Sequence, residues 1–349
     1  MRFSVKIFIL GGYMKRILTV LGVLMIGSVL FAMGANEQTS SSGGGKKDIT
    51  IVVMPKLVGI PYFNASEKGA VQAGKDLGIT VNYTGPTTAD AADQVRMLED
   101  LITKGVDAIC VAPNNAQALT PVLMKAKRAG ILVLDWDTPA DPSVVDYSVH
   151  QIDDKQFGEH NWDLLVKYMG TSGDYAILTG GLSAANLNSW LDYGLAYAKT
   201  KYPNLHLVTD RVPTDEKQQL AYQKTLDLIK AYPNLKGLVC VSTPAPIGAA
   251  QAVQEKGMQN KIAVVGSALP TDSGPYLEDG SLKTATLWDP SKLGYLTVCV
   301  AYNALKGQKP TDGMDVPNVG KITVLSDGRT IIMGPPSDFL KENYKNFAF

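Results

Sequence analysis

Two carboxylates separated by one residue are the most chemically suggestive feature of the sequence. Asp135 and Asp137 flank Trp136 at the end of an apolar run that begins at Ile131. Residues two apart on a strand point to the same side, so both carboxylates are expected to face one ligand and accept hydrogen bonds from its hydroxyl groups. The alternatives are a hard metal ion held by both carboxylates and a structural Asp137 that caps the turn at Thr138-Pro139. We favour recognition of a polar organic ligand.

Polar and aromatic side chains also follow several other apolar runs. Lys56 comes directly after a run typical of a buried strand, which favours a position in a cleft over a solvated surface charge. Aromatic faces suit the C–H faces of a sugar ring, although a single aromatic residue more often packs than stacks on a ligand. Their combination with amide and carboxylate groups indicates a binding site. The further candidates are Tyr62, Phe63, Trp136, Asn186, Asn188, Trp288 and Asp289.

These candidates lie along the same edge of a sheet only if strands and helices alternate along the chain. In the first half, strands are expected at Asp48 to Met54, Thr80 to Tyr83, Ala108 to Ala112 and Ile131 to Asp135, with helices at Ala65 to Gly78, Ala89 to Lys104 and Ala116 to Ala129. In the second half, strands are expected at Tyr175 to Thr179, at His206 to Thr209 and around Val239 and Val264, with helices at Trp190 to Lys201, Gln218 to Ala231 and Ser291 to Leu305. Such alternation requires parallel sheets, whose ligands meet the loops at the carboxyl ends of the strands.

The two halves of the chain resemble each other. Ile109-Cys110-Val111-Ala112-Pro113 is echoed by Val239-Cys240-Val241-Ser242-Thr243. A repeated strand-helix-strand unit indicates duplicated sheets, so the predicted fold class is α/β, with two doubly wound parallel-sheet lobes joined by a hinge. Lobe one is expected at residues 48–150 with a return segment near 285–315, and lobe two at 151–284 with the segment 316–349. Two such lobes form a cleft.

The N-terminal region is typical of a secretory signal peptide. Lys15 and Arg16 precede an apolar run, Ile17 to Ala32, and Ala32-Met33-Gly34 places small residues at a cleavage site. We therefore predict a signal at residues 1–34, with Met14 as the natural start, and a polar tether at 35–47. A retained membrane anchor is the alternative, but the run is short for a span of about 20 residues. No Cys lies near the cleavage site, which favours a free periplasmic protein over a lipid-anchored one.

Composition excludes several classes of function. The 33 basic and 33 acidic residues balance, so no general positive field exists to hold nucleic acid or an anionic membrane. The three cysteines lie in apolar runs with no disulfide or metal-type spacing, and we expect them to be buried hydrophobes. Nucleotide-binding glycine fingerprints and a nucleophile elbow are both missing from the sequence. No metal or cofactor is expected.

With these residues in view, the chain resembles the type I periplasmic solute-binding proteins for sugars, in the branch that binds rhamnose or autoinducer-2. The matching segments follow the branch's order over nearly the whole chain after residue 47. They are Met54-Pro55-Lys56-Leu57-Val58-Gly59 with Phe63, Trp136-Asp137, Leu287-Trp288-Asp289, Val319-Gly320-Lys321-Ile322-Thr323-Val324, and the ending Lys341-Glu342-Asn343 with Phe349.

The resemblance implies two hinged lobes that close around a ligand. Lys56 and Asp137 would be polar contacts from lobe one, while the segment Val241-Ser242-Thr243 would contribute from lobe two, Val241 and Thr243 through backbone groups. The autoinducer-2 receptor is expected to carry Asp-Gln where this chain has Asn186-Leu187. That departure favours a deoxyhexose, a pentose or another polyol over autoinducer-2.

The implied function is capture of a small sugar-like solute by a monomer, without catalysis, and delivery to an ABC permease or a chemoreceptor. Two other classes compete with it. The effector-binding half of a sugar-responsive repressor shares this fold, but the signal peptide and the lack of a helix-turn-helix oppose it. A secreted carbohydrate-acting enzyme would use Asp135 and Asp137 as an acid/base pair, but carboxylates adjacent on one strand do not flank a scissile bond well.

Overall fold

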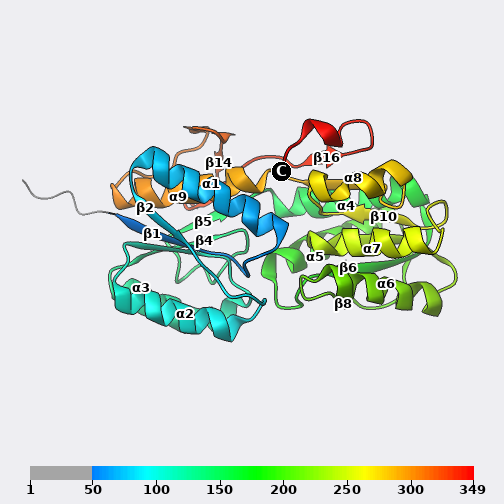
Figure 1. Cartoon of the computed structure of the whole chain (residues 1–349), viewed down its shortest axis with the longest axis horizontal. Helices are drawn as coiled ribbons and strands as arrows, with labels where there is room; N and C mark the ends of the chain where they lie inside the picture. The colour runs from blue at the N-terminus through cyan, green and yellow to red at the C-terminus, as the bar shows by residue number, and fades with distance from the viewer. Residues whose placement is uncertain (1–48) are drawn as a thin grey trace, which may run out of the picture. The chain divides into compact units, whose positions relative to one another are not determined.

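The computed structural model describes residues 49–349, whose course is shown in Figure 1. Two seven-stranded sheets form the centres of two lobes within this range. This confirms the predicted fold class, two α/β lobes built on largely parallel sheets. The predicted signal peptide at 1–34 and tether at 35–47 lie outside the described residues.

The first sheet has the strand order β14-β15-β5-β4-β3-β1-β2. Helices α1 and α9 cover one face of this sheet and α2 and α3 cover the other (Figure 1). The elements of this lobe are β1 (Thr50–Met54), α1 (Pro61–Leu77), β2 (Thr80–Tyr83), α2 (Ala91–Lys104), β3 (Ala108–Val111), α3 (Ala116–Arg128), β4 (Leu132–Trp136), β5 (Tyr147–His150), α9 (Pro290–Leu305), β14 (Thr323–Val324) and β15 (Thr330–Ile332).

The second sheet has the order β16-β11-β10-β9-β6-β7, and β8 also pairs with β6. Its elements are α4 (Asp154–Met169), β6 (Ser172–Thr179), α5 (Ala185–Lys201), β7 (Asn204–Leu207), β8 (Val212–Pro213), α6 (Gln218–Ala231), β9 (Leu235–Val241), α7 (Pro244–Glu255), β10 (Ala263–Gly266), α8 (Pro270–Asp279), β11 (Thr284–Leu287) and β16 (Ser337–Phe339). A small ladder of β12 (Asp315–Val316) and β13 (Gly320–Lys321) and a 3-10 turn, Tyr344–Asn346, complete the described elements.

The chain passes between the lobes at three places, after β5, after β11 and after β15. The assignment of the whole segment 316–349 to lobe two is therefore wrong. β15 pairs with β5 and β14 pairs with β15, so both extend the first sheet, and only β16 joins the second sheet by pairing with β11. The amino-acid sequence of these strands does not show which sheet they join. They are short, and a short edge strand pairs with whichever sheet edge the folded chain brings beside it.

Local signals explain where most helices begin and end. The Asp90 side chain accepts hydrogen bonds from the backbone N–H groups of Ala92 and Asp93, so α2 begins just after the predicted Ala89. Proline at the first position starts α1 at Pro61, four residues before the predicted Ala65. Helix α5 likewise begins at Ala185 rather than near Trp190. Tyr62, Phe63, Asn186 and Asn188, which we expected in loops, consequently lie in first helical turns.

Helices α1 and α9 approach each other through glycine. A Cβ atom at Gly69 would lie 1.7 Å from the carbonyl oxygen of Ser291, and one at Gly294 would lie 2.0 Å from that of Ser66. Any larger residue at either position would force the helices apart. Since α9 follows the second crossing, this contact fixes the crossing segment against lobe one.

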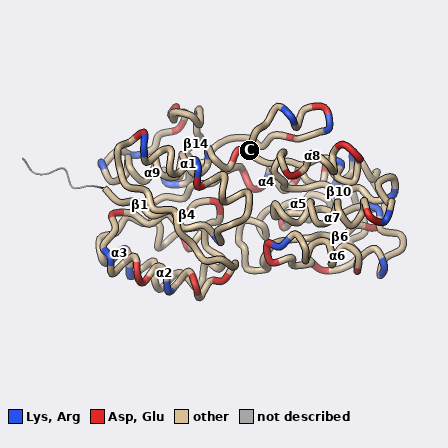
Figure 2. The backbone as a smooth tube through the Cα atoms, viewed as in Figure 1, with Lys and Arg blue, Asp and Glu red and all other residues tan. Residues whose placement is uncertain are grey.

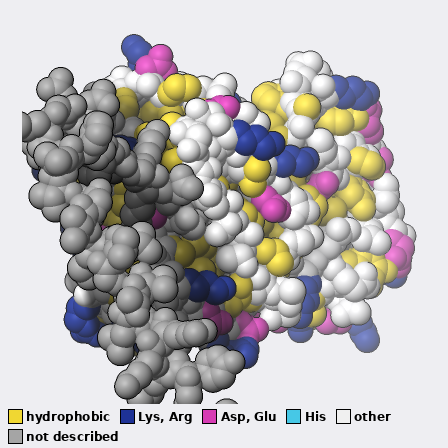
Figure 3. Space-filling view, turned by 60° about the vertical axis from the view of Figure 1, so that its left-hand side comes forward, with side chains coloured by type: hydrophobic (Ala, Val, Ile, Leu, Met, Phe, Trp, Pro, Cys, Tyr) yellow, Lys and Arg dark blue, Asp and Glu magenta, His cyan; other side chains and the backbone are white. Residues whose placement is uncertain are grey.

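The burial of the cysteines and the even spread of charged residues agree with the predictions from the sequence. Cys110, Cys240 and Cys299 are free and buried, as predicted. Acidic and basic side chains are scattered over both lobes (Figure 2), and the face in Figure 3 mixes them with hydrophobic ones. Within residues 49–349, none of the helices is long and apolar enough to cross a membrane.

Candidate ligand-binding site

A cavity lies where the carboxyl ends of the two sheets meet. About 360 Å³ of space lies between its lining atoms, its opening to solvent included, and the centre of a water-sized sphere can occupy about 30 Å³ of it. Residues from both lobes line it. They are Lys56, Ile60, Tyr62, Phe63 and Asp137 from lobe one, Asn186, Leu187, Trp190, Glu216, Ser242, Thr243 and Ser267 from lobe two, and Leu287 and Trp288 at the second crossing.

Lobe one supplies a connected set of polar groups. The Tyr62 hydroxyl donates to Asp137 Oδ1 at 2.6 Å, and it accepts from Trp288 Nε1 at 2.9 Å. Lys56 Nζ lies 3.7 Å from Asp137 Oδ2, and both side chains are about 5% exposed. Burial, followed by the negative charge of Asp137, raises the pKa of Tyr62 well above its ordinary value, so the phenol remains a neutral donor. Asp137 is therefore held in place before any ligand arrives.

Two hydrogen bonds join lobe one to lobe two, and the first of them lies within the cavity lining. Lys56 Nζ donates to Asn186 Oδ1 at 3.0 Å, and Ser183 Oγ donates to the Asn114 carbonyl at 2.8 Å. The buried side chain of Gln94 ties together the loops that follow β1 and β3. Its amide nitrogen donates to the carbonyls of Pro55 and Ala112, and its oxygen accepts from the Asn114 backbone. The lobes are thus in a closed arrangement, with lobe-one loops held by a buried amide.

Lobe two supplies a carboxyl group and small hydroxyls. Glu216 is buried, and burial raises the pKa of its carboxyl, while Lys56 and Ser242 lower it. The Ser242 hydroxyl lies beside Glu216 and stabilises the ionised carboxyl as a hydrogen-bond donor, whereas Ser267 Oγ has no hydrogen-bond partner within residues 49–349. A buried polar group normally has a partner, so the Ser267 hydroxyl is available to a ligand.

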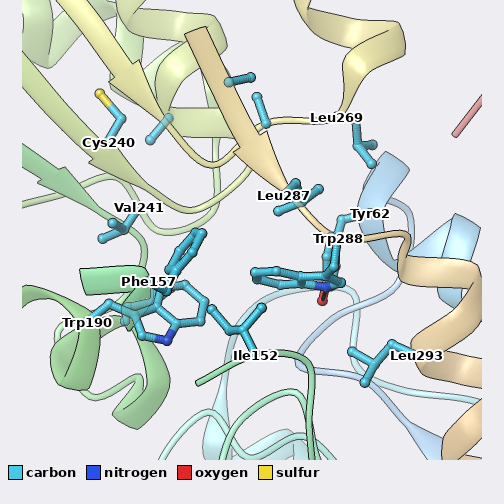
Figure 4. Packing of buried hydrophobic residues seen from close by; sticks show 14 of the residues in the cluster. Tyr62, Ile152, Phe157, Trp190, Cys240, Val241, Leu269, Leu287, Trp288 and Leu293 are labelled. Carbon is cyan, nitrogen blue, oxygen red and sulfur yellow. Dashed lines mark hydrogen bonds between the residues drawn. The ribbon is translucent and has the colours of Figure 1, made fainter. Parts of the chain in front are cut away.

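Aromatic rings form a continuous wall at the second crossing (Figure 4). The Trp288 ring packs edge-on against Trp190 at 5.7 Å, against Phe157 at 5.6 Å and against Tyr62 at 6.1 Å between centroids. Trp190 Nε1 donates to Asp154 Oδ1 at 2.7 Å, which fixes the indole from lobe two. Rings from both lobes and from the crossing therefore meet beside the cavity.

Backbone strain is concentrated in the polar residues of the cavity. Asp137 has φ 61°, Glu216 has φ 57° and Ser242 has φ 152°, and few other non-glycine residues in the described range have positive φ. Such conformations persist only where the surrounding structure enforces them, and they cluster at functional sites. The strain at all three positions supports a role in binding.

The expectation that Asp135 and Asp137 face one ligand is wrong. Strand β4 ends at Trp136, and the left-handed backbone of Asp137 breaks the alternation of side chains. Asp135 instead accepts from the Ala140 backbone N–H at 2.8 Å and from the Ser148 hydroxyl. Burial raises the pKa of Asp135 to about 6. Its carboxyl holds the loop after β4 and lies outside the cavity lining.

Four other candidates also lie outside the cavity lining, each with a structural task. Trp136 is fully buried and donates from Nε1 to the Met54 carbonyl at 3.2 Å. Val241 is the buried last residue of β9, paired with Thr179. Asn188 donates to the Leu182 carbonyl and accepts from Arg211. Asp289 caps α9 by accepting from the Ser291 backbone.

Sequence reasoning missed Glu216, Ser267, Ile60, Trp190 and Leu287 as lining residues. Ser267 follows the predicted strand around Val264, so the rule for strand ends could have found it. Glu216 follows β8, a strand of only two residues, and no apolar run marks its position. Within residues 49–349, no group of three or more His, Cys, Asp or Glu side chains is arranged to hold a metal ion.

Comparisons with known proteins agree with this architecture. Residues 51–309 match the family model described as "Periplasmic binding protein domain". The D-allose-binding periplasmic protein of Escherichia coli is 23% identical over 265 residues, covering 74% of this chain and 85% of that protein. The ribose import binding protein of Bacillus subtilis is 24% identical over 280 residues, covering 79% of this chain and 88% of that protein.

Two solved structures share the fold over most of the chain. LsrB from Clostridium saccharobutylicum in complex with AI-2 is 27% identical, with a TM-score of 0.80, covering 86% of this chain and 100% of that chain. An ABC transporter solute-binding protein from Clostridium phytofermentans with bound L-rhamnose is 29% identical, with a TM-score of 0.80, covering 86% of this chain and 98% of that chain. The chain belongs to the periplasmic binding protein family, as a type I substrate-binding protein and not an enzyme.

Proposed function

We propose that this protein captures a single deoxyhexose or pentose, with rhamnose as the favoured ligand, and delivers it to an ABC importer. The coarser role, a sugar-binding component of such importers, is supported by the family. The observation that carries the finer proposal is the closed cavity, in which Lys56 and Asp137 of lobe one face Asn186 and Ser242 of lobe two.

The chemistry of the lining suits a small carbohydrate. Asp137 accepts hydrogen bonds and Lys56 donates them, while Asn186 can do both, so sugar hydroxyls find complementary partners. Ile60, Leu187 and Leu287 add aliphatic surface beside the aromatic rings. Such a surface suits the methyl group of a deoxyhexose, whereas an additional ligand hydroxyl would find no hydrogen-bond partner there. The balance of groups therefore supports a sugar with fewer hydroxyls than a full hexose.

Closure is proposed to depend on contacts from both lobes. A ligand shifts an equilibrium between open and closed lobes only by its differential affinity for the two states. A sugar that touches lobe one alone gives no such difference, whereas one that bridges Asp137 and the lobe-two side chains binds the closed state better. The hinge would consist of the three crossing segments.

Autoinducer-2 is the alternative ligand, since one structural relative was solved with AI-2. Leu187 lines the cavity but offers no hydrogen-bonding group, and the neighbouring Asn186 carries an amide where the resemblance expects a carboxylate. Replacing both, as Asn186→Asp with Leu187→Gln, should raise affinity for autoinducer-2 at least tenfold. Unchanged affinity in a folded variant would show that specificity for this ligand lies elsewhere.

We also propose a periplasmic location, a monomeric state and delivery to a permease, with a chemoreceptor as a further partner. The family is described as periplasmic, which supports the location. Size-exclusion chromatography with light scattering would test the monomer, and a dimer at micromolar concentration would overturn it.

Ligand-dependent melting tests the proposed function directly. Residues 35–349 would be expressed, unfolded and refolded to remove bound ligand, and heated with L-rhamnose, D-ribose, D-arabinose, D-allose or autoinducer-2. A ligand at 100 times its Kd stabilises by about 2.7 kcal/mol, which for a chain of this size shifts the melting temperature by about 4 °C. A saturable shift with L-rhamnose, D-ribose or D-arabinose supports the proposal, whereas a shift with D-allose or autoinducer-2 alone, or no shift at all, rejects it.

A further inference from the structure

A histidine stands at the first crossing between the lobes, outside the lining of the ligand cavity. His150 is the last residue of β5, and Ser148 lies two residues before it, on the same side of the strand. Ser148 Oγ lies 2.8 Å from His150 Nε2 and donates a hydrogen bond to Asp135 on the neighbouring strand β4. The Ser148 oxygen therefore accepts from the imidazole, and these bonds hold His150 on lobe one.

Asp154 takes the matching position on lobe two. It is the first residue of α4, and its Oδ1 accepts from Trp190 Nε1 of α5 at 2.7 Å. Burial raises the pKa of the Asp154 carboxyl, and the charge of His150 is the largest effect that opposes it. The pKa of Asp135 is raised by burial and opposed by His150 in the same way. One imidazole thus stabilises an ionised carboxyl in each lobe.

The distance between His150 and Asp154 depends on how the lobes are arranged. Only residues 151–153 separate them, and the third crossing runs alongside, since the Met333 N–H donates to the His150 carbonyl at 2.8 Å. A rotation of the lobes about these segments carries His150 with β5 and Asp154 with α4. Asp135 lies in the same sheet as His150, so the distance between those two groups does not change. Closure therefore acts on the His150 and Asp154 pair.

Other charged or titratable groups near His150 have partners or lie in water. They are Tyr147, Asp146, Asp327 and Arg329 around a hollow beside β5, and Asp153 and Lys155 at the start of α4. Asp146 pairs with Lys127 at 2.9 Å. Asp153 caps α4, and Asp327 caps the turn before β15. The two basic groups in this set are exposed and screened by water. Among the described residues around the crossing, His150 is therefore the basic group whose charge changes between pH 8 and pH 5.

We propose that the first crossing is a proton-linked hinge, in which protonated His150 on lobe one attracts Asp154 on lobe two and favours the closed arrangement as the pH falls from 8 to 5.5. The inference goes beyond the proposed function, because it concerns closure and applies to any ligand that needs closed lobes. Such a protein takes up protons when it closes and holds its ligand more tightly in mildly acidic surroundings.

Two effects make the closed arrangement bind protons more tightly than the open one. A protonated His150 gains the nearby Asp154 carboxylate on closure, which stabilises the imidazolium. Asp154 itself is further removed from water when the lobes meet, which favours its protonated form. A state that binds protons more tightly gains stability as the pH falls. Both effects have the same sign, so acid favours closure.

The three histidines of the chain supply matched variants. His150→Gln removes the charge and keeps an N–H donor at the end of the side chain. His160→Gln and His206→Gln are the controls, because each of these histidines pairs with a carboxylate inside lobe two. Asp154→Asn removes the charge on the other side of the crossing, keeps an acceptor for Trp190, and tests the hinge even where His150→Gln does not fold. Circular dichroism establishes which variants are folded.

Closure without ligand is measured as the distance between two spin labels. Met124→Cys on α3 of lobe one and Tyr193→Cys on α5 of lobe two carry them, since these side chains are 42% and 44% exposed and the three native cysteines are buried. In the wild-type background we expect the ratio of closed to open protein to rise about threefold to tenfold from pH 8 to pH 5.5. The rise should persist in the two controls and fall below half in His150→Gln and Asp154→Asn. An undiminished rise in either folded variant would overturn the inference, as would no rise in the wild-type background.

Sugar binding gives a second measure of the same hinge. Calorimetry at pH 8 and pH 5.5, in buffers with different ionisation enthalpies, yields both the affinity and the number of protons taken up. Burial also raises the pKa of Glu216 in the cavity, so this residue adds to the pH dependence of every variant. The contribution of the hinge is the difference between wild type and His150→Gln. We expect wild type to gain about threefold to tenfold more affinity at the lower pH and to take up more protons. Equal gains and equal proton uptake would contradict the hinge.

Failure of the proposed function gives a different result. If wild type binds none of the tested sugars, that function is rejected, and the distances between the spin labels decide the hinge by themselves. A rise in closure at low pH that depends on His150 would then keep the hinge for a different ligand, and a rise that does not depend on it would reject the hinge as well.

Discussion

The two lobes prepare their sides of the cavity differently. In lobe one, Lys56, Asp137 and Tyr62 contact one another, and Trp288 donates to the Tyr62 hydroxyl. In lobe two, the Ser267 hydroxyl has no partner in the described part of the chain, and the Ser242 hydroxyl has Glu216 alone beside it. A connected network is preorganised and binds without rearrangement, whereas unpaired groups gain most when a ligand arrives. We infer that lobe one positions the ligand and that lobe two gains the free energy that favours closure.

The largest effect is expected at the centre of the lobe-one network. Asp137→Ala removes the acceptor of the Tyr62 hydroxyl and the partner of the Lys56 charge. We expect an unchanged fold by circular dichroism and at least a hundredfold loss of sugar affinity by calorimetry, corresponding to about 3 kcal/mol. Asp137→Asn keeps an acceptor and tolerates the left-handed backbone, so its loss should be smaller. The exposed Asp210→Ala serves as the control. Normal sugar affinity in a folded Asp137→Ala variant would show that the lobe-one network does not hold the ligand.

A smaller effect is expected from one methyl group in lobe two. Gly180→Ala places a Cβ atom where the Glu216 carboxyl lies, whereas Gly181→Ala meets no atom within 4 Å. We expect affinity to fall about tenfold in the first variant and to stay unchanged in the second, since losing one hydrogen bond costs about 1 to 3 kcal/mol. Titration of both variants with the same sugar measures this difference. Equal affinities would mean that the position of Glu216 is unimportant for binding.

The smallest effect on binding is expected at Asp135, the lobe-one carboxyl outside the cavity. Burial raises the pKa of Asp135 to about 6, above its ordinary value of 3.8. The Asp135 carboxyl therefore binds its proton more tightly in the folded protein than in the unfolded chain. The protonated carboxyl contributes fully to the free energy of unfolding below about pH 4, and this contribution is lost as the pH rises through 6. Asn at this position cannot ionise and retains an acceptor for the Ala140 N–H.

The stability of Asp135→Asn should consequently depend on pH in a defined way. Relative to the variant, wild type should gain on the order of 1 to 3 kcal/mol between pH 7 and pH 4, measured by urea unfolding. Sugar affinity at pH 7 should change less than threefold. A difference in stability that is constant over this pH range would show that Asp135 does not titrate there.

Much of the fold could be predicted because its signals are local. Continuous apolar runs gave β1, β3 and β4, and the capping of α2 by Asp90 is written in adjacent residues. The rule that ligands meet the carboxyl ends of parallel strands pointed to Lys56 and Asp137, and both line the cavity. It failed for Asp135 because the left-handed turn at Asp137 breaks the strand pattern, and it failed for Glu216 because β8 is too short to produce one.

The sequence by itself determined two α/β lobes, free buried cysteines and a family with a ligand between its lobes, since strand runs and strand-end loops depend on neighbouring residues. Only the tertiary structure decided which polar groups share the cavity. Lys56 meets Asn186 across 130 residues, and Tyr62 meets Trp288 across 226. Such pairs are set by the order of the strands in each sheet and by the three crossings, which local patterns do not encode.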